Sequence, residues 1–212
     1  MKIIWALLIV LLIIGGAFMS DRIFDRVKVS VLSRKAIHIT AGIGMLILPF
    51  VFESFWWPLG ISIFFLIALS ILHFTNAKFG YGVRTPGRFV EIWFCVSCVV
   101  VYALIWPINP WLATAPLLFL SWGDGITGGI RFLFYKKQGK KGLFGSLGMW
   151  VVCLIIGVTM IHPFWLGIGG ATVATIVEKI TPSEGKFLDD NWSIVLSSAL
   201  FMLLVGRAVG AY

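Results

Sequence analysis

Long, continuously apolar segments occupy most of the 212-residue chain and constrain its fold more than any other feature. Most of them approach the ~20 residues that a helix needs to cross a bilayer. The eight segments lie at approximately residues 3–19, 37–52, 55–74, 90–106, 111–134, 147–161, 164–180 and 192–210. With 59% hydrophobic and only 12% charged residues, the chain has more apolar surface than a soluble domain can bury. We therefore predict an all-α, polytopic transmembrane bundle, because helices satisfy their backbone hydrogen bonds within one segment in lipid.

The connections between these segments give an independent test of the number of spans. Fifteen of the seventeen Lys and Arg residues fall in every second connection, which places them on one side of the membrane. By the positive-inside rule that side is the cytoplasm, and both termini then lie outside. The alternation requires an even number of spans and favours eight. A brief break at Glu53 and Ser54 also leaves open seven spans and a re-entrant segment.

The remaining features describe one membrane-embedded domain, residues 1–212. Residues 1–20 are expected to form an N-terminal anchor helix rather than a cleaved signal, because basic residues follow the apolar run. Five tryptophans fall at the predicted outer boundaries, as an interfacial belt does: Trp56, Trp57, Trp106, Trp111 and Trp165. The net charge of +8 suits anionic lipid headgroups and an anionic substrate, whereas nucleic acid is not an expected partner.

Two carboxylates lie inside the predicted spans, where a charged side chain is costly. Asp124 comes thirteen residues after Trp111, and Glu178 comes fourteen residues after Phe164. At 1.5 Å per residue, both acids lie ~20 Å into a core ~30 Å thick, toward the cytoplasmic side. This agreement predicts a shared site. Asp124 alone also fits a buried ion pair with a lysine or arginine.

Other polar groups approach the same side of the membrane. Arg34, Lys35 and His38 can share a helix face, although the first two also fit the positive-inside rule. His38 also fits a buried core histidine with a satisfied ring. Asp190 is either a helix N-cap or a functional acid. Two more groups are expected to cap or pair near the surface: His73 and Glu91.

A glycine-rich stretch surrounds Asp124, with the sequence G-D-G-I-T-G-G at residues 123–129. It is not a dinucleotide fingerprint, because no strand precedes it, but glycine does allow a backbone to approach a ligand closely. Lysines and then a Gly-Ser pair follow it: Lys136, Lys137, Lys140, Lys141, Gly145 and Ser146. Lysines and backbone amides suit phosphate oxygens, and carboxylates suit Mg²⁺. Phosphoryl transfer needs these parts and little else.

Three of these segments together resemble the polyprenol kinases, the CTP-dependent membrane enzymes that include dolichol kinase and phytol kinase. S-R-K-A-I-H at 33–38 looks like the R-K-x-x-H segment of the family, and residues 123–149 are similar to its nucleotide-binding stretch. Glu178 with D-D-N at 189–191 looks like its closing V-E…D-N element. The motifs occur in family order and cover most of residues 33–200. Phe144 replaces the glutamate of dolichol kinase, Gly142 replaces a hydroxyl residue, and Met149 matches phytol kinase-like members better.

The resemblance implies an integral membrane kinase that transfers the γ-phosphate of CTP to a polyisoprenoid alcohol of the dolichol, phytol or geranylgeraniol type. It implies catalytic roles for Asp124, Arg34, Lys35 and His38. Mg²⁺ would be bound by Asp124, Glu178 and Asp190. Nucleotide contacts would come from Lys140, Lys141, Gly145, Ser146, Gly125 and Asn191, with backbone amides supplied at the Gly-Ser pair. The alternatives are a diacylglycerol kinase or a CDP-lipid synthase and, in a different class, a small transporter.

Overall fold

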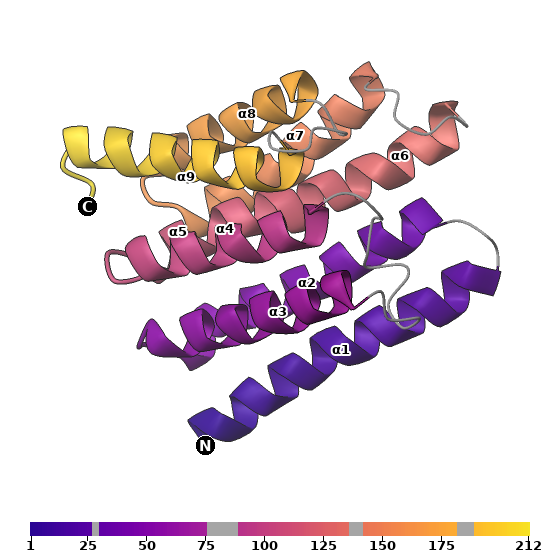
Figure 1. Cartoon of the computed structure of the whole chain (residues 1–212). Coiled ribbons are helices and arrows are strands. Elements are labelled where there is room, and N and C mark those ends of the chain that lie inside the picture. Colours follow the sequence, from indigo (N-terminus) through magenta and orange to yellow (C-terminus); the bar gives the residue numbers. More distant parts are fainter. Residues whose placement is uncertain (27–29, 76–88, 136–141, 182–188) are drawn as a thin grey trace.

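The computed structural model describes residues 1–26, 30–75, 89–135, 142–181 and 189–212, and its regular elements there are all helices (Figure 1). In chain order they are α1 (Lys2–Arg26), α2 (Ser30–Val51), α3 (Trp56–Phe74), α4 (Val90–Leu104), α5 (Pro110–Leu118), the π-helical η1 (Phe119–Asp124), α6 (Gly125–Tyr135), α7 (Leu143–Met160), α8 (Phe164–Ile180) and α9 (Asp190–Ala208). Because α5, η1 and α6 are continuous, the described residues form eight helical rods. The all-α prediction is confirmed.

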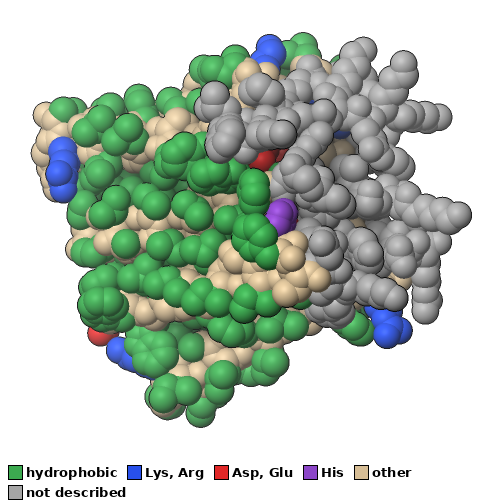
Figure 2. Space-filling view, viewed as in Figure 1, with side chains coloured by type: hydrophobic (Ala, Val, Ile, Leu, Met, Phe, Trp, Pro, Cys, Tyr) green, Lys and Arg blue, Asp and Glu red, His purple; other side chains and the backbone are tan. Residues whose placement is uncertain are grey.

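Four of the helices are long and apolar enough to cross a membrane: Lys2–Ser20 of α1, and α3, α7 and α9. Two shorter apolar stretches, Lys35–Val51 of α2 and the whole of α4, accompany them. Figure 2 shows one face of the molecule, on which hydrophobic side chains cover most of the described surface. Four long apolar helices with such a surface indicate an integral, multi-pass membrane protein.

The rods lie side by side and alternate in direction, so that their ends gather at two ends of the bundle (Figure 1). We call the end at which α1, α3, α6 and α8 finish the acid end, for the carboxylates described below. Both termini lie at the other end, which we call the far end. This arrangement agrees with the even number of segments predicted from the charge alternation. The side of the membrane that each end faces stays a prediction.

The centre of the bundle is the α5–η1 segment. Leu117, Leu118, Phe119 and Leu120 are all completely buried there, among helices that include α2, α7 and α9. Pro116 precedes the π-helical turn and has no N–H to donate, and a helix that contains such a residue is rarely regular. The widened turn ends at Asp124, and π-helical turns of this kind are often found at functional sites.

Helices α7 and α8 approach one another backbone to backbone toward the far end. A Cβ atom added at Gly167 would lie 2.1 Å from the Gly157 carbonyl oxygen, and one added at Gly157 would lie 2.5 Å from the Gly167 oxygen. Small residues at such a crossing are typical of helix packing in membranes, where close van der Waals contact replaces the hydrophobic effect.

The observed helix bounds differ from the predicted segments mainly at the acid end. Helix α1 continues to Arg26, α2 begins at Ser30, and α7, which corresponds to the sixth predicted segment, begins at Leu143. Hydrophobicity marks what lipid covers, whereas the hydrogen-bonded helix continues past that boundary. At the far end, the prediction that Trp106 lies at a lipid interface is wrong. Trp106 is 1% exposed, and its Nε1–H donates to the Glu53 carbonyl oxygen at 3.2 Å, because the chain turns back there.

Candidate functional site

Three carboxylates from three different elements meet at the acid end. Asp124 is the last residue of η1, Glu178 lies in the last turn of α8, and Asp190 is the first residue of α9. One carboxylate oxygen from each lies within 4.8 Å of the others. Asp124 is 3% exposed and Glu178 is completely buried. The structure thus brings together the two acids whose predicted depths agreed, and adds Asp190.

Two basic side chains face this acid cluster. Lys35 Nζ on α2 donates to Asp124 Oδ2, and Arg131 Nη2 on α6 donates to Glu178 Oε1 at 2.9 Å. Asp190 forms no ion pair with any residue that the structure describes. The ion pair expected as an alternative for Asp124 is therefore present, and it belongs to a larger cluster.

Two of the glycines near Asp124, Gly125 and Gly128, make room for α2. A Cβ atom at Gly128 would lie 2.9 Å from the Lys35 side chain, so the stem of that lysine passes across the glycine on its way to Asp124. A Cβ atom at Gly125 would lie 2.8 Å from Ile39 and 3.7 Å from the Lys35 carbonyl oxygen. The nucleotide contact expected at Gly125 is therefore not supported, because α2 already occupies that face of the residue.

The start of α9 resolves the two roles that the sequence left open for Asp190. Asp189 is the N-cap, and its Oδ1 accepts from the Asn191 backbone N–H at 2.8 Å. The N-cap alternative for Asp190 is therefore wrong, because the preceding aspartate satisfies that N–H. Asn191, expected near the nucleotide, is 2% exposed, and its Nδ2 donates to the Val90 carbonyl oxygen at 3.3 Å. It thus holds the start of α9 against the start of α4.

The start of α7 changes the interpretation of the Gly-Ser pair. The Ser146 backbone N–H donates to the Gly142 carbonyl oxygen at 3.3 Å, so this amide already has a partner within the chain and its predicted contact with a phosphate is not supported. The Ser146 hydroxyl, in contrast, is buried and has no hydrogen-bond partner among the described residues. A Cβ atom at Gly145 would lie 2.7 Å from Arg131 Nε, so this glycine lets the guanidinium pass beneath α7.

The structure does not assemble all of the expected residues. His38 is 8% exposed, and its ring lies 4.9 Å from that of Phe94 on α4, so it faces α4 and is not a member of the acid cluster. Lys140 and Lys141 lie outside the described residues, as does the side chain of Arg34. Lys35 is therefore the member of the expected basic group whose contact with the cluster can be described.

Sequence reasoning missed two residues that organise the cluster. Arg131 was counted among the basic loop residues, although it follows Asp124 by seven positions, which is about two helical turns and hence the same face. Thr127 is completely buried, and its hydroxyl contacts the Gly123 and Gly145 carbonyl oxygens at 2.7 and 3.2 Å. It thereby joins α6 to α7. The helical spacing from Asp124 was the signal that could have found both.

The donor set fits a hard divalent cation. Three carboxylates supply only oxygen ligands, which Mg²⁺ prefers, and no histidine or cysteine belongs to the cluster. Two ligands on opposite sides of one Mg²⁺ lie ~4.2 Å apart. Neighbouring ligands of the same ion lie ~3 Å apart, so oxygens that lie within 4.8 Å of one another would have to move closer to bind one ion together. The residues present therefore match the ion that the sequence predicted.

Comparison of this chain with models of known protein families, with curated proteins and with solved structures finds no match.

Proposed function

We propose that the chain is an integral membrane phosphotransferase that transfers the γ-phosphate of a nucleoside triphosphate to the hydroxyl group of a membrane lipid. One observation carries the proposal: Asp124, Glu178 and Asp190 converge at one end of an apolar bundle and are flanked by Lys35 and Arg131. Such a combination of acids and cations is what a metal-bound polyphosphate requires. A charged cluster inside a membrane protein costs free energy, and such clusters therefore usually mark functional sites.

The identity of the two substrates rests on the resemblance to the polyprenol kinases. By that resemblance the donor is CTP, and the acceptor is a polyisoprenoid alcohol of the dolichol, phytol or geranylgeraniol type. The acid end would face the cytoplasm, where nucleotides are abundant, and all eight rods would cross the membrane with both termini outside. The basic residues in alternate connections support this orientation.

In the reaction, a bond forms between the alcohol oxygen and the γ-phosphorus while the bond from that phosphorus to the β–γ bridging oxygen breaks. The nucleoside diphosphate leaves, and the hydroxyl proton goes to a base. A divalent cation held by the three carboxylates would supply charge neutralisation for the phosphate oxygens. Lys35 and Arg131 hold two of the acids in place and add positive charge beside them. Burial of the cluster excludes water, which would otherwise compete with the alcohol.

Product analysis tests this proposal. Purified protein in lipid nanodiscs is given Mg²⁺, labelled CTP, ATP or GTP, and a panel of geranylgeraniol, phytol, dolichol and diacylglycerol. A labelled phospholipid product together with a nucleoside diphosphate is expected. Release of pyrophosphate from CTP when phosphatidic acid is supplied as the acceptor would instead identify a CDP-lipid synthase. No labelled lipid with any nucleotide would overturn the proposal.

A pair of isosteric variants tests the site separately from the reaction. Asp124→Asn is expected to lower kcat/KM at least ~10²-fold, because a metal ligand contributes several kcal/mol to the transition state. Glu53→Gln, at the far end, is the matched control and should keep full activity. Full activity in Asp124→Asn would show that the transfer occurs elsewhere.

A further inference from the structure

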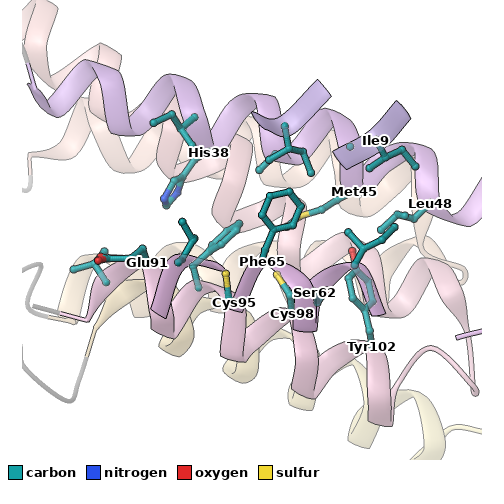
Figure 3. A pocket seen from close by; sticks show the side chains of 18 residues that line it. Ile9, His38, Met45, Leu48, Ser62, Phe65, Glu91, Cys95, Cys98 and Tyr102 are labelled. Atoms are coloured by element: carbon teal, nitrogen blue, oxygen red, sulfur yellow. The ribbon is translucent and has the colours of Figure 1, made fainter. Parts of the chain in front are cut away.

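An apolar groove runs between α1, α2, α3 and α4 (Figure 3), with a cavity volume of about 90 Å³. His38 and Glu91 lie toward one end of it, and Leu48 and Tyr102 lie toward the other. Apart from its polar end, the groove is lined mainly by aliphatic, aromatic and sulfur-containing side chains, which include Met45 and Cys98. Its walls are therefore compatible with a hydrocarbon ligand.

The groove is long and narrow. On α2 its lining extends from His38 to Leu48, and on α4 from Glu91 to Tyr102, a distance of ~15 Å in each case at 1.5 Å per residue. At ~1.5 Å per carbon–carbon bond, a zigzag chain of this length has on the order of a dozen carbons. The cavity volume of about 90 Å³ is smaller than a chain of that length, so a ligand must move lining side chains apart, and no space remains for a second chain.

The polar end of the groove contains a carboxylate oxygen that lacks a donor. Glu91 is 6% exposed, and its Oε1 lies 2.8 Å from His73 Nδ1. Its Oε2 is buried and has no hydrogen-bond partner among the described residues. A buried acceptor left in this state costs free energy, because the water that it loses on folding is not replaced. A hydroxyl group that enters the groove can donate to this oxygen.

The same end of the groove adjoins the acid cluster. Val90, the residue before Glu91, accepts the hydrogen bond from Asn191 at 3.3 Å, and Asn191 directly follows Asp190. The rings of Trp93 and Trp192 lie 5.5 Å apart and hold the same two helix starts together. On the opposite wall, His38 comes three residues after Lys35, the partner of Asp124. The polar end of the groove and the acid cluster are therefore joined through the starts of α4 and α9 and through α2.

We infer that this groove holds the hydrocarbon chain of the acceptor, a single-chain alcohol, while Glu91 Oε2 accepts a hydrogen bond from its hydroxyl group. The inference rests on the proposed function for the identity of the ligand as an acceptor. It deepens that function by favouring a linear isoprenoid alcohol over diacylglycerol, whose two acyl chains need far more space than a cavity of about 90 Å³ offers. Glu91 then fixes the position of the hydroxyl, and the length of the groove favours chains that reach Leu48 and Tyr102.

Photo-crosslinking tests the groove without nucleotide or Mg²⁺ and therefore independently of catalysis. Geraniol and geranylgeraniol that carry a diazirine at the end of the chain are bound to the protein in nanodiscs, and the adducts are mapped by mass spectrometry. The longer probe should label residues near Leu48 and Tyr102, and the shorter probe should label residues near Met45 and Cys98. Unlabelled geranylgeraniol should compete, whereas diacylglycerol should not. Adducts confined to lipid-exposed faces, or equal competition by diacylglycerol, would overturn the inference.

A variant at the polar end tests the role assigned to Glu91. Glu91→Leu is expected to weaken binding of geranylgeraniol at least ~10-fold, since a hydrogen bond to a charged group is lost. Binding of the matching hydrocarbon that lacks the hydroxyl should be unchanged, which shows that the groove has kept its shape. An equal loss for both ligands would contradict the contact with the hydroxyl.

The two proposals can fail separately. Crosslinks in the groove without any phosphorylated product would support the groove as a lipid-binding site and contradict the proposed kinase activity. A phosphorylated alcohol whose crosslinks map elsewhere would support the kinase activity and contradict the groove as the acceptor site.

Discussion

The two ends of the bundle hold their helices together in different ways. At the acid end, the ion pairs Lys35–Asp124 and Arg131–Glu178 cross between helices, and all four side chains are largely or completely buried. At the far end, Gly157 and Gly167 bring two backbones into contact. The one ion pair described there, Lys2–Glu53 at 3.9 Å, is exposed.

This difference bears on function, because buried ion pairs are weak evidence of stability. The cost of removing two charges from water often exceeds their attraction, and apolar replacements of both partners are often neutral or stabilising. The far end demonstrates that this chain can join helices without buried charge. The charges at the acid end are therefore better explained by a binding or catalytic role than by a contribution to stability.

The largest effect is expected from breaking one buried pair at the acid end. Arg131→Gln removes the cation that the structure pairs with the completely buried Glu178 carboxylate and should lower the free energy of unfolding by ~3–5 kcal/mol. Mg²⁺ should restore part of the loss, because a cation at the cluster replaces the missing charge. Thermal unfolding of the protein in detergent, with and without Mg²⁺, measures both effects.

The double variant Arg131→Met/Glu178→Met serves as the control. It should regain most of the stability of the natural chain, because neither charge remains buried, but it should lack both activity and the response to Mg²⁺. If the double variant were as unstable as the single one, the Arg131–Glu178 pair would contribute to stability itself. The functional explanation of the buried charges at the acid end would then be contradicted.

What the sequence could predict follows the range of the physical interactions involved. Helix content and the common depth of Asp124 and Glu178 were predictable, because the length of an apolar run and the rise per residue are properties of one segment at a time. The partner of Arg131 was not, because it depends on how α6 and α8 are aligned along their length. The apolar groove is likewise a gap between helices that are distant in sequence.

Local ambiguity limited the rest of the site. Asp189 and Asp190 both stand where an N-cap is expected, and only the backbone geometry assigns the cap to the first of them. From the sequence, the glycines around Asp124 could face either a ligand or a neighbouring helix. For Gly125 and Gly128, the structure shows that the neighbour is α2, with Lys35 among the contacts. His73 and Glu91 were expected to cap or pair near the surface; the structure pairs them with one another, although both side chains are largely buried. The second oxygen of Glu91 became informative only once the groove was known.

A smaller effect is expected from disturbing the far end by sterics alone. Gly167→Ala places a Cβ atom on the backbone of α7, so the two helices must separate, and overpacking of this kind costs ~1–3 kcal/mol. The melting temperature should fall, while activity per folded molecule should remain. Gly60→Ala on α3 is the control, because nothing lies within 4 Å of its added Cβ. A loss of activity without a loss of stability in Gly167→Ala would link the far end to the chemistry.

Removing one buried hydrogen bond at the far end should have a still smaller effect. Trp106→Phe removes the N–H donated to the Glu53 carbonyl and is expected to cost about 1 kcal/mol. Trp165→Phe is the control, since Trp165 is 43% exposed and donates no hydrogen bond to any described residue that the structure records. Equal shifts in melting temperature for the two variants would mean that this bond does not hold the turn.

The smallest effect is expected from removing an exposed charge at the far end, and the same chemical change at the acid end provides the contrast. Glu53→Gln removes the charge of a side chain that is 97% exposed and 3.9 Å from a half-exposed lysine, so neither the melting temperature nor activity should change measurably. Glu178→Gln removes the same charge from a completely buried member of the acid cluster and should abolish phosphoryl transfer. Because the two substitutions differ only in location, their ratio of activities measures how far function is confined to one end. A ratio near one would contradict the assignment of the site to the acid end.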